Sequence, residues 1–189
     1  EKANSLGFLN HNKKDSTGIC FIGERNFRKF LKKYFDEQPG EIISEKGTVI
    51  GEHEGLMYYT YGQRQGLGIG GGHGTIDAPW YVSDKIIQEN RLVAVQGHDH
   101  PDLYHSYLTA TNINWISGSS PSENDIITSK IRYRSKDSGC KIKKQSDSIL
   151  VEFDSPQFAV APGQSIVFYR NDVCIGGGII DTRSNKPNH

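Results

Sequence analysis

The segment Ser165-Ile166-Val167-Phe168-Tyr169-Arg170-Asn171-Asp172-Val173-Cys174-Ile175-Gly176-Gly177-Gly178-Ile179-Ile180 decides the fold class of this chain. Its two apolar runs flank the turn residues Arg170-Asn171-Asp172, which is the pattern of two strands joined by a tight turn. We predict these two strands at 165–169 and 173–181. Six further strands are predicted at 80–85, 91–96, 108–116, 126–134, 140–145 and 149–154. Short strands separated by Gly, Pro, Ser and Asn indicate an antiparallel barrel or sandwich.

Composition limits the class of protein. The chain has 189 residues, enough for one large or two small domains, and its 22 basic residues balance its 22 acidic residues. No apolar run approaches the length of about 18 residues that a membrane span needs. Three widely spaced cysteines argue against a disulfide scaffold and favour a reducing, cytoplasmic location. The chain begins without Met in what reads as the tail of a helix, so we expect it to be a piece of a longer protein.

The region before the barrel has a mixed character. Apolar spacing predicts a helix over residues 24–36, which ends at the breaker residues Pro39 and Gly40. The segments 47–53 and 56–61 flank a Glu-Gly turn and predict a hairpin. We therefore expect a small α+β unit, with the boundary to the β unit near residues 95–105.

A glycine-rich stretch at 62–74 follows this predicted hairpin. It contains G-x-G spacings, which a dinucleotide-binding loop would also show. No helix is expected after it, because residues 75–82 are extended and interrupted by Pro79. The pattern therefore favours a surface loop that can approach a ligand backbone over a nucleotide-binding loop.

Cys20 precedes the predicted basic helix. The unpaired N–H groups at a helix start and nearby cations, including Lys13 and Lys14, favour the thiolate form that reacts. The alternative is a small buried core residue, and these local features do not separate the two. A cysteine-peptidase dyad is a weaker alternative, because nothing in the sequence places a histidine beside Cys20.

Two polar clusters are candidate binding sites. Residues 98–105 contain three histidines and two aspartates, which a metal site would need, but Pro101 favours a turn. A strand over 126–134 would put Arg132 and Arg134 on one face beside Tyr133, with the lysines of 140–145 on the next strand. Such a basic ribbon suits a phosphate backbone and stacked bases, whereas the alternative is a solvated strand face.

Three motifs carry a resemblance to a known family. The segment 13–24 around Cys20 resembles the catalytic-cysteine segment of bacterial tRNA-specific 2-thiouridylases. Residues 59–69 are similar to that family's glycine-rich hairpin. Residues 159–169 and 173–180 resemble its C-terminal barrel, which is similar to the barrels of translation elongation factors. The three matches follow the family's order from about residue 5 to residue 181.

The resemblance implies sulfur transfer to the wobble uridine of tRNA through a persulfide on Cys20. It implies RNA contacts by Arg132, Tyr133 and Gln164, and it matches Cys140 and Cys174 to no catalytic position, so we expect both to be structural. Because no third ligand stands out at a convincing spacing, we expect no metal ligands in this chain. It also implies three domains: the remnant of an ATP-pyrophosphatase domain at 1–28, a central α+β domain at 29–97 and a tRNA-binding barrel at 98–184.

The family also implies cofactors and partners. ATP with Mg would bind upstream of residue 1, where the resemblance also places a second catalytic cysteine, so we expect these 189 residues alone to be inactive. The expected partners are tRNAs for glutamate, glutamine and lysine, and a sulfur-relay protein or cysteine desulfurase, without a membrane. The alternative function is a non-catalytic barrel that docks tRNA.

Overall fold

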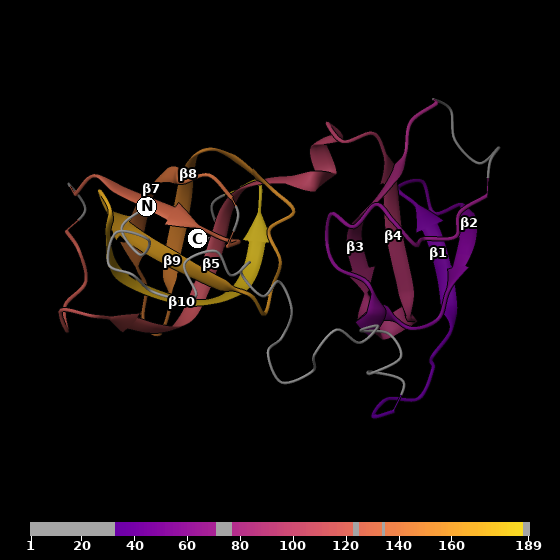
Figure 1. Ribbon diagram of the computed structural model, residues 1–189, viewed down its shortest axis with the longest axis horizontal. Helices are drawn as coiled ribbons and strands as arrows, with labels where there is room; N and C mark the ends of the chain where they lie inside the picture. The colour runs from indigo at the N-terminus through magenta and orange to yellow at the C-terminus, as the bar shows by residue number, and fades with distance from the viewer. Residues whose placement is uncertain (1–32, 71–76, 123–124, 134, 187–189) are drawn as a thin grey trace, which may run out of the picture. The chain divides into compact units, whose positions relative to one another are not determined.

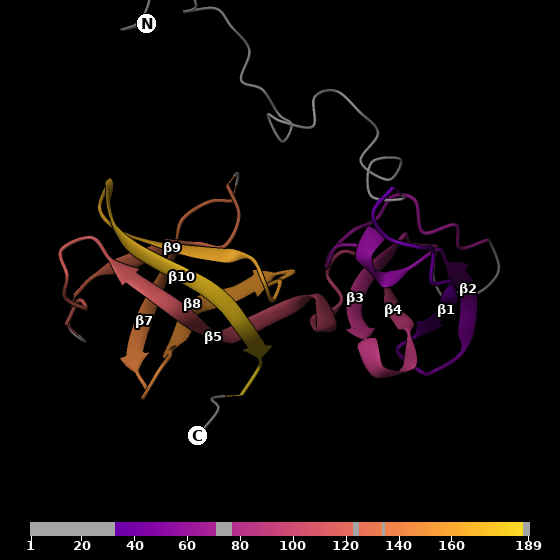
Figure 2. The ribbon, with the colours of Figure 1, turned by 90° about the horizontal axis from the view of Figure 1, so that it is seen from below.

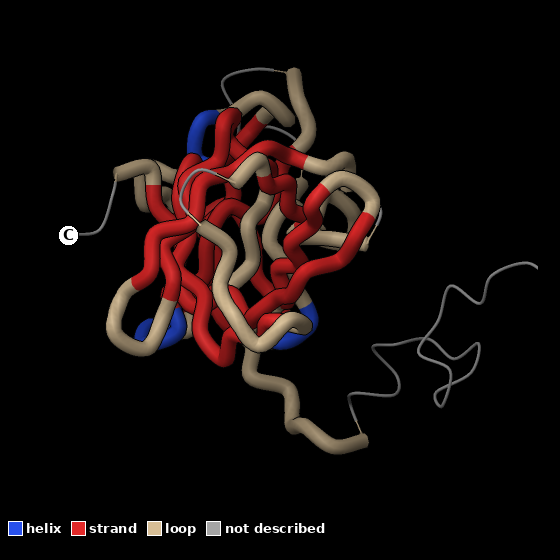
Figure 3. The backbone as a smooth tube through the Cα atoms, turned by 90° about the vertical axis from the view of Figure 1, so that its left-hand side faces the viewer, coloured by secondary structure: helices blue, strands red, loops and turns tan. Residues whose placement is uncertain are grey.

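The structure is a computed structural model that describes residues 33–70, 77–122, 125–133 and 135–186 (Figure 1). Cys20 and residues 24–32 of the predicted helix 24–36 lie outside the described residues, and residues 33–35 form a turn and bend. All the strands lie in the compact unit Gln38–His189. Within the described ranges, helical structure is limited to three short 3-10 turns, at Leu56–Tyr58, Ile87–Glu89 and Pro101–Leu103 (Figure 3). No described helix is long and apolar enough to cross a membrane.

The first four strands form a small mixed sheet. These strands are β1 (Gly40–Ser44), β2 (Val49–His53), β3 (Trp80–Ile86) and β4 (Arg91–Gln96). Their order is β2-β1-β4-β3, in which β1 and β4 are parallel and the other neighbours are antiparallel. The predicted strands at 80–85 and 91–96 are thus confirmed, whereas β1 has no counterpart among the predictions.

The predicted hairpin of 47–53 with 56–61 is wrong. β2 pairs instead with β1, across a turn at Gly47, which has a φ of 79°. The chain then makes a 3-10 turn, and both Tyr58 and Tyr59 are buried. Successive side chains of a strand point to opposite faces of the sheet. A strand would therefore have pointed one of these two tyrosines away from the core.

The remaining six strands form the predicted antiparallel barrel. They are β5 (Tyr104–Trp115), β6 (Ile127–Lys130), β7 (Ser138–Lys144), β8 (Ile149–Phe158), β9 (Ser165–Arg170) and β10 (Val173–Ser184). The closed order is β10-β5-β8-β7-β6-β9, and β10 lies between β5 and β9 (Figure 2). Closure removes the exposed edges that an open sheet would present.

The barrel interior explains why the strands of this region could be predicted. Ile166 and Phe168 of β9 are buried and alternate with less buried neighbours, and they form one core with Leu108 of β5 and Val151 of β8. The boundaries differ in one place that matters for the site. β6 ends at Lys130, so the prediction of a strand reaching residue 134 is wrong. Ser135 donates its backbone N–H and its hydroxyl to the Arg132 carbonyl, which closes a turn there.

Candidate functional site

The three predicted RNA-binding residues of the barrel lie at the same end of it. Arg132 and Tyr133 follow the last residue of β6, and Gln164 precedes the first residue of β9. β6 and β9 are antiparallel neighbours, with Lys130 opposite Val167. The end of one strand therefore lies beside the start of the other. We call this the β6–β9 end of the barrel, and β8 also finishes there, at Phe158.

Arg132 is half-buried and uses one nitrogen to join two segments. Its Nη2 donates to the carbonyl of Tyr61 at 2.9 Å and to the carbonyl of Ala159 at 3.0 Å. Burial lowers the pKa of the guanidinium from its usual value, but an arginine stays charged in proteins. Arg132 therefore connects the start of the glycine-rich stretch to the segment that follows β8.

Tyr133 and Gln164 are both presented to solvent. Tyr133 is 88% exposed, which is unusual for a large aromatic side chain. Gln164 closes a turn by donating its backbone N–H to the Ala161 carbonyl, and its own carbonyl accepts from Ile180. Its backbone is therefore fixed while its side chain is exposed. An exposed ring and an exposed amide are groups that can stack on a base and bond to its edge.

The predicted basic ribbon does not form one strand face. Arg132 lies in a turn, and Arg134 lies outside the described residues. Lys141, Lys143 and Lys144 are exposed on β7, but β7 begins near the β6–β9 end and runs away from it. At about 3.3 Å per residue, Lys144 is about 20 Å farther along the barrel than Ser138. The lysines and Arg132 consequently do not present one continuous patch.

Tyr61 is held by two further cations. The Arg183 guanidinium lies 4.1 Å from the centre of the Tyr61 ring, and the Lys85 ammonium lies 5.4 Å from it. Both distances suit cation–π attraction. Burial raises the pKa of the Tyr61 phenol, and the nearby Arg183 opposes that rise. Lys85 also donates to the carbonyls of Leu56 at 2.9 Å and Tyr59 at 2.5 Å.

Arg183 is a nearly buried cation that contacts both the sheet and the barrel. Its side chain is 9% exposed and forms an ion pair with Asp84 at 3.0 Å. It also donates to the carbonyl of Ser83 at 2.6 Å and to that of Val160 at 3.1 Å. Because Ser83 lies on β3 and Val160 follows β8, these bonds tie the sheet to the barrel. A buried charge is tolerated when its donors are satisfied in this way.

Gly62 brings the glycine-rich stretch into contact with the barrel. Its φ is 75°, and a Cβ added to it would lie 2.5 Å from the Ala159 Cβ and 2.8 Å from the Phe158 ring. Gly62 donates to the Val82 carbonyl at 2.7 Å, and Val82 donates to the Gln63 carbonyl at 3.0 Å. Gly62 and Gln63 thus lie beside β3. The described residues 77–79 lead into β3 without a helix, which agrees with the prediction for these three residues.

The histidine cluster forms a turn, as Pro101 indicates. The His98 ring stacks on Phe158 with 4.7 Å between centroids, and His100 Nδ1 accepts the Asp102 N–H. Burial and the nearby Arg183 lower the pKa of His105 to about 4. Among residues 33–70, 77–122, 125–133 and 135–186, no three His, Cys, Asp or Glu side chains are grouped to hold a metal ion.

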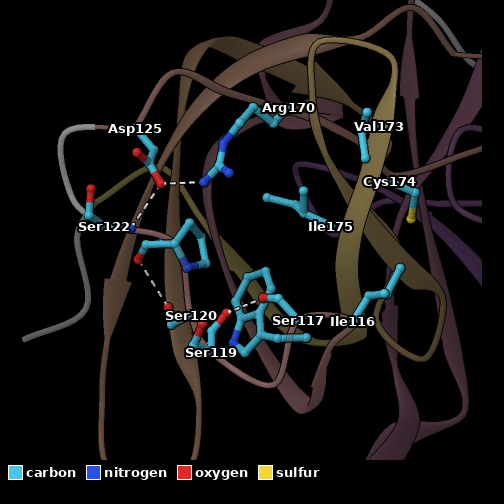
Figure 4. Close-up of a pocket in the computed structure, with 12 residues that line it drawn as sticks. Ile116, Ser117, Ser119, Ser120, Ser122, Asp125, Arg170, Val173, Cys174 and Ile175 are labelled. Carbon is cyan, nitrogen blue, oxygen red and sulfur yellow. Dashed lines mark hydrogen bonds and ion pairs between the residues drawn. The ribbon is translucent and has the colours of Figure 1, made fainter.

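The opposite end of the barrel carries a hollow of about 440 Å³ (Figure 4). Its wall contains the ion pair of Arg170 with Asp125, at 2.6 Å, and the exposed residues Val173 and Cys174. None of Arg132, Tyr133 and Gln164 lines it.

The two described cysteines differ in exposure. Cys140 is buried in the barrel core, and burial raises the pKa of its thiol, as a structural role requires. Cys174 is exposed, so the structural role expected for it cannot be that of a small apolar residue in the core. Cys174 lies at the start of β10, close to the turn at Asn171, where Val173 is exposed too and a bulge follows before Gly176.

Sequence reasoning missed Arg183 and the role of Tyr61. The sequence analysis includes Tyr61 in the motif 59–69 but gives it no role of its own. Arg183 lies two residues beyond the predicted strand 173–181. No local pattern marks Arg183, because all its partners are distant in sequence, up to 100 residues away.

Comparison with known proteins agrees with this architecture. Residues 28–96 match the family described as tRNA methyl transferase PRC-barrel domain, and residues 105–180 match the family described as Aminomethyltransferase beta-barrel domain. The chain is 50% identical to a protein of Hydrogenovibrio crunogenus, over 96% of this chain and 48% of the relative. It is 54% identical to a protein of Thiobacillus denitrificans, over 95% of this chain and 51% of the relative. Both relatives are named tRNA-specific 2-thiouridylase MnmA.

A relative from Francisella philomiragia carries the same name and is 52% identical over 95% of this chain and 50% of its own length. The resemblance that the three motifs predict is thus confirmed: nearly the whole chain is similar to proteins named tRNA-specific 2-thiouridylase. It spans about half the length of the curated relatives that it matches.

Proposed function

We propose that this chain takes part in 2-thiouridine formation in tRNA, as the part of the enzyme that docks tRNA and carries the sulfur-bearing cysteine. The observation that carries the proposal is identity of 50–54% across nearly the whole chain to proteins named for this activity. The Cys20 segment and the β6–β9 end of the barrel support it from the residues themselves.

The proposed chemistry places a persulfide on Cys20. A thiolate is required to accept a sulfane sulfur from a cysteine desulfurase or a sulfur-relay protein in the cytoplasm. The terminal sulfur then attacks C2 of the wobble uridine in tRNAs for glutamate, glutamine or lysine, and the activated O2 leaves C2 together with its activating group. A second cysteine of the whole protein forms a disulfide with Cys20 as that sulfur leaves.

ATP with Mg would activate the uridine, and the described residues do not fit this cofactor. The described residues 77–79 lead into β3, so residues 77–86 offer no helix N-terminus for a phosphate chain. We therefore place ATP binding in residues other than these and derive no step for it here.

Persulfide formation on Cys20 can be tested by peptide mass spectrometry. The chain is incubated with a cysteine desulfurase and cysteine, and each thiol peptide is examined for the added mass of one sulfur atom. Cys20→Ser should abolish the adduct on its peptide. Cys174→Ser is the matched control, because Cys174 is an exposed thiol that reagents can reach. An adduct on Cys174 and none on Cys20 would contradict the proposal.

Docking of tRNA is tested separately, by filter binding of a tRNA transcript for glutamate. Loss of a base-stacking ring costs about 1–3 kcal/mol, so Tyr133→Ala should weaken binding by at least about fivefold. Arg170→Gln at the opposite end of the barrel is the control. Equal affinities of Tyr133→Ala, Gln164→Ala and the unchanged chain would refute docking at the β6–β9 end.

The second candidate function is a barrel that docks tRNA without chemistry. The exposed Tyr133 and Gln164 favour it independently of Cys20. Retained tRNA binding together with no persulfide on Cys20 would support this function over sulfur transfer.

A further inference from the structure

We propose that Arg132 and Arg183 are positioning residues that hold the glycine-rich stretch against the barrel, so that both together form one RNA-binding surface. This inference rests on the proposed docking of tRNA and deepens it. It assigns Arg132 a different task from the phosphate contact that the sequence predicts. It also adds residues 61–70 to the surface formed by Tyr133 and Gln164.

The first argument is the geometry around Tyr61. Arg132 holds its carbonyl, and Arg183 lies against its ring. Each arginine also bonds to the segment that follows β8, Arg132 through the carbonyl of Ala159 and Arg183 through that of Val160. One tyrosine is therefore attached at both its backbone and its side chain to the same short barrel segment.

The second argument is burial. The side chain of Arg183 is 9% exposed, so a bound polyanion has little access to its charge. Asp84 and the Ser83 carbonyl already accept from it. Arg132 also donates to acceptors within the protein, because its Nη2 is shared between the carbonyls of Tyr61 and Ala159. Both arginines are thus used inside the protein.

The third argument is what the stretch presents once it is held. Arg64 and Gln65 are exposed three and four residues after Tyr61. The Gln63 side chain accepts from the Thr60 N–H at 2.9 Å and donates to the Gln65 carbonyl at 2.8 Å, which stabilises this part of the stretch. Arg64 offers a charge for phosphate, and Tyr133 offers a ring for a base. Fixing Tyr61 and Gly62 against the barrel brings these groups to one surface.

Binding of a tRNA transcript at several KCl concentrations separates positioning from direct contact. Each phosphate contact that is lost lowers the salt dependence of log K by about one. We expect Arg64→Gln to lower that slope by about one. Arg183→Gln should weaken binding about tenfold, or about 1.4 kcal/mol, and leave the slope unchanged. Arg183→Lys should restore part of the affinity, because it keeps a cation beside Tyr61.

A second measurement follows the glycine-rich stretch without RNA. Hydrogen exchange of peptides covering residues 56–70 should become faster in Arg183→Gln and in Tyr61→Leu. Arg91→Gln is the matched control. Arg91 lies on β4 and also forms two ion pairs, one with Glu41 and one with Glu89. Urea unfolding verifies that each variant is folded, and Tyr61→Leu replaces Arg183→Gln if that variant does not fold.

The outcomes distinguish this inference from the proposed function. Unchanged tRNA binding in Tyr133→Ala and Gln164→Ala would refute docking itself. Weaker binding in those variants, with unchanged affinity and exchange in Arg183→Gln and Tyr61→Leu, would overturn the positioning inference alone. A salt slope lowered by about one in Arg132→Gln would show that Arg132 contacts phosphate, and would overturn its positioning role.

Discussion

Replacing Gly62 by alanine tests the contact between the glycine-rich stretch and the barrel. Gly62 has a φ of 75°, and an added Cβ would lie 2.5 Å from the Ala159 Cβ and 2.8 Å from Phe158 Cε1. A left-handed backbone costs an alanine about 1–2 kcal/mol. An extra methyl group forced into a packed site costs about 1–3 kcal/mol more. We expect Gly62→Ala to lower the free energy of unfolding by about 2–5 kcal/mol.

Gly68→Ala is the matched control in the same stretch. Gly68 has a φ of 66°, and nothing lies within 4 Å of an added Cβ. Only the backbone cost of about 1–2 kcal/mol should therefore appear. Urea unfolding, monitored by circular dichroism, measures the free energy of unfolding of both variants. The comparison requires that the dependence of this free energy on urea concentration, the slope m, is unchanged. Equal destabilisation by the two substitutions would refute the close approach of Gly62 to the barrel.

A double variant sharpens this test. Ala159 itself has a φ of 52°, which glycine adopts without strain. Adding Ala159→Gly to Gly62→Ala removes the Cβ that the new methyl group would meet. We expect the double variant to regain part of the lost stability. Simple additivity of the two substitutions would count against direct contact between these positions.

Three further predictions follow from exposure and charge. Because the folded pKa of His105 is about 4, below the ordinary value of 6.5, its contribution to stability is complete above pH 6.5 and is lost as the pH falls toward 4. Between pH 7 and pH 4 the free energy of unfolding of the unchanged chain should fall by about 2 kcal/mol more than that of His105→Gln, after allowance for solvent screening. Urea unfolding at each pH measures this difference. Equal pH dependence in the two proteins would contradict the prediction. In a Cys20→Ser variant, Cys174 should react with a thiol reagent in the folded protein and Cys140 only in denaturant, as thiol titration would measure. In filter binding, Tyr133→Ala should lower tRNA affinity without changing the salt slope, because a ring carries no charge; a lowered slope would indicate a shifted docking mode.

Local patterns were sufficient for most of the barrel. Strands such as β9 and β10 contain apolar runs with turn residues between them, and burial in a closed barrel follows the same alternation. The mainly β fold could therefore be predicted from these patterns, and the family resemblance from the three motifs. β1 was missed because five residues with two isoleucines give a weak signal. The hairpin after β2 was mispredicted because two neighbouring tyrosines are both buried in a non-repeating turn.

The sequence by itself determined the class of fold, the family resemblance and the candidate residues Arg132, Tyr133 and Gln164. Tertiary structure decided which contacts Arg132 makes. Arg132 became an internal connector because the carbonyls of Tyr61 and Ala159, 71 and 27 residues away, lie within reach of one nitrogen. Arg183 acquired its role in the same way, by burial against β3 and the Tyr61 ring. Apolar alternation is a property of neighbours in sequence, whereas the partner of a buried charge is set only when distant segments pack together.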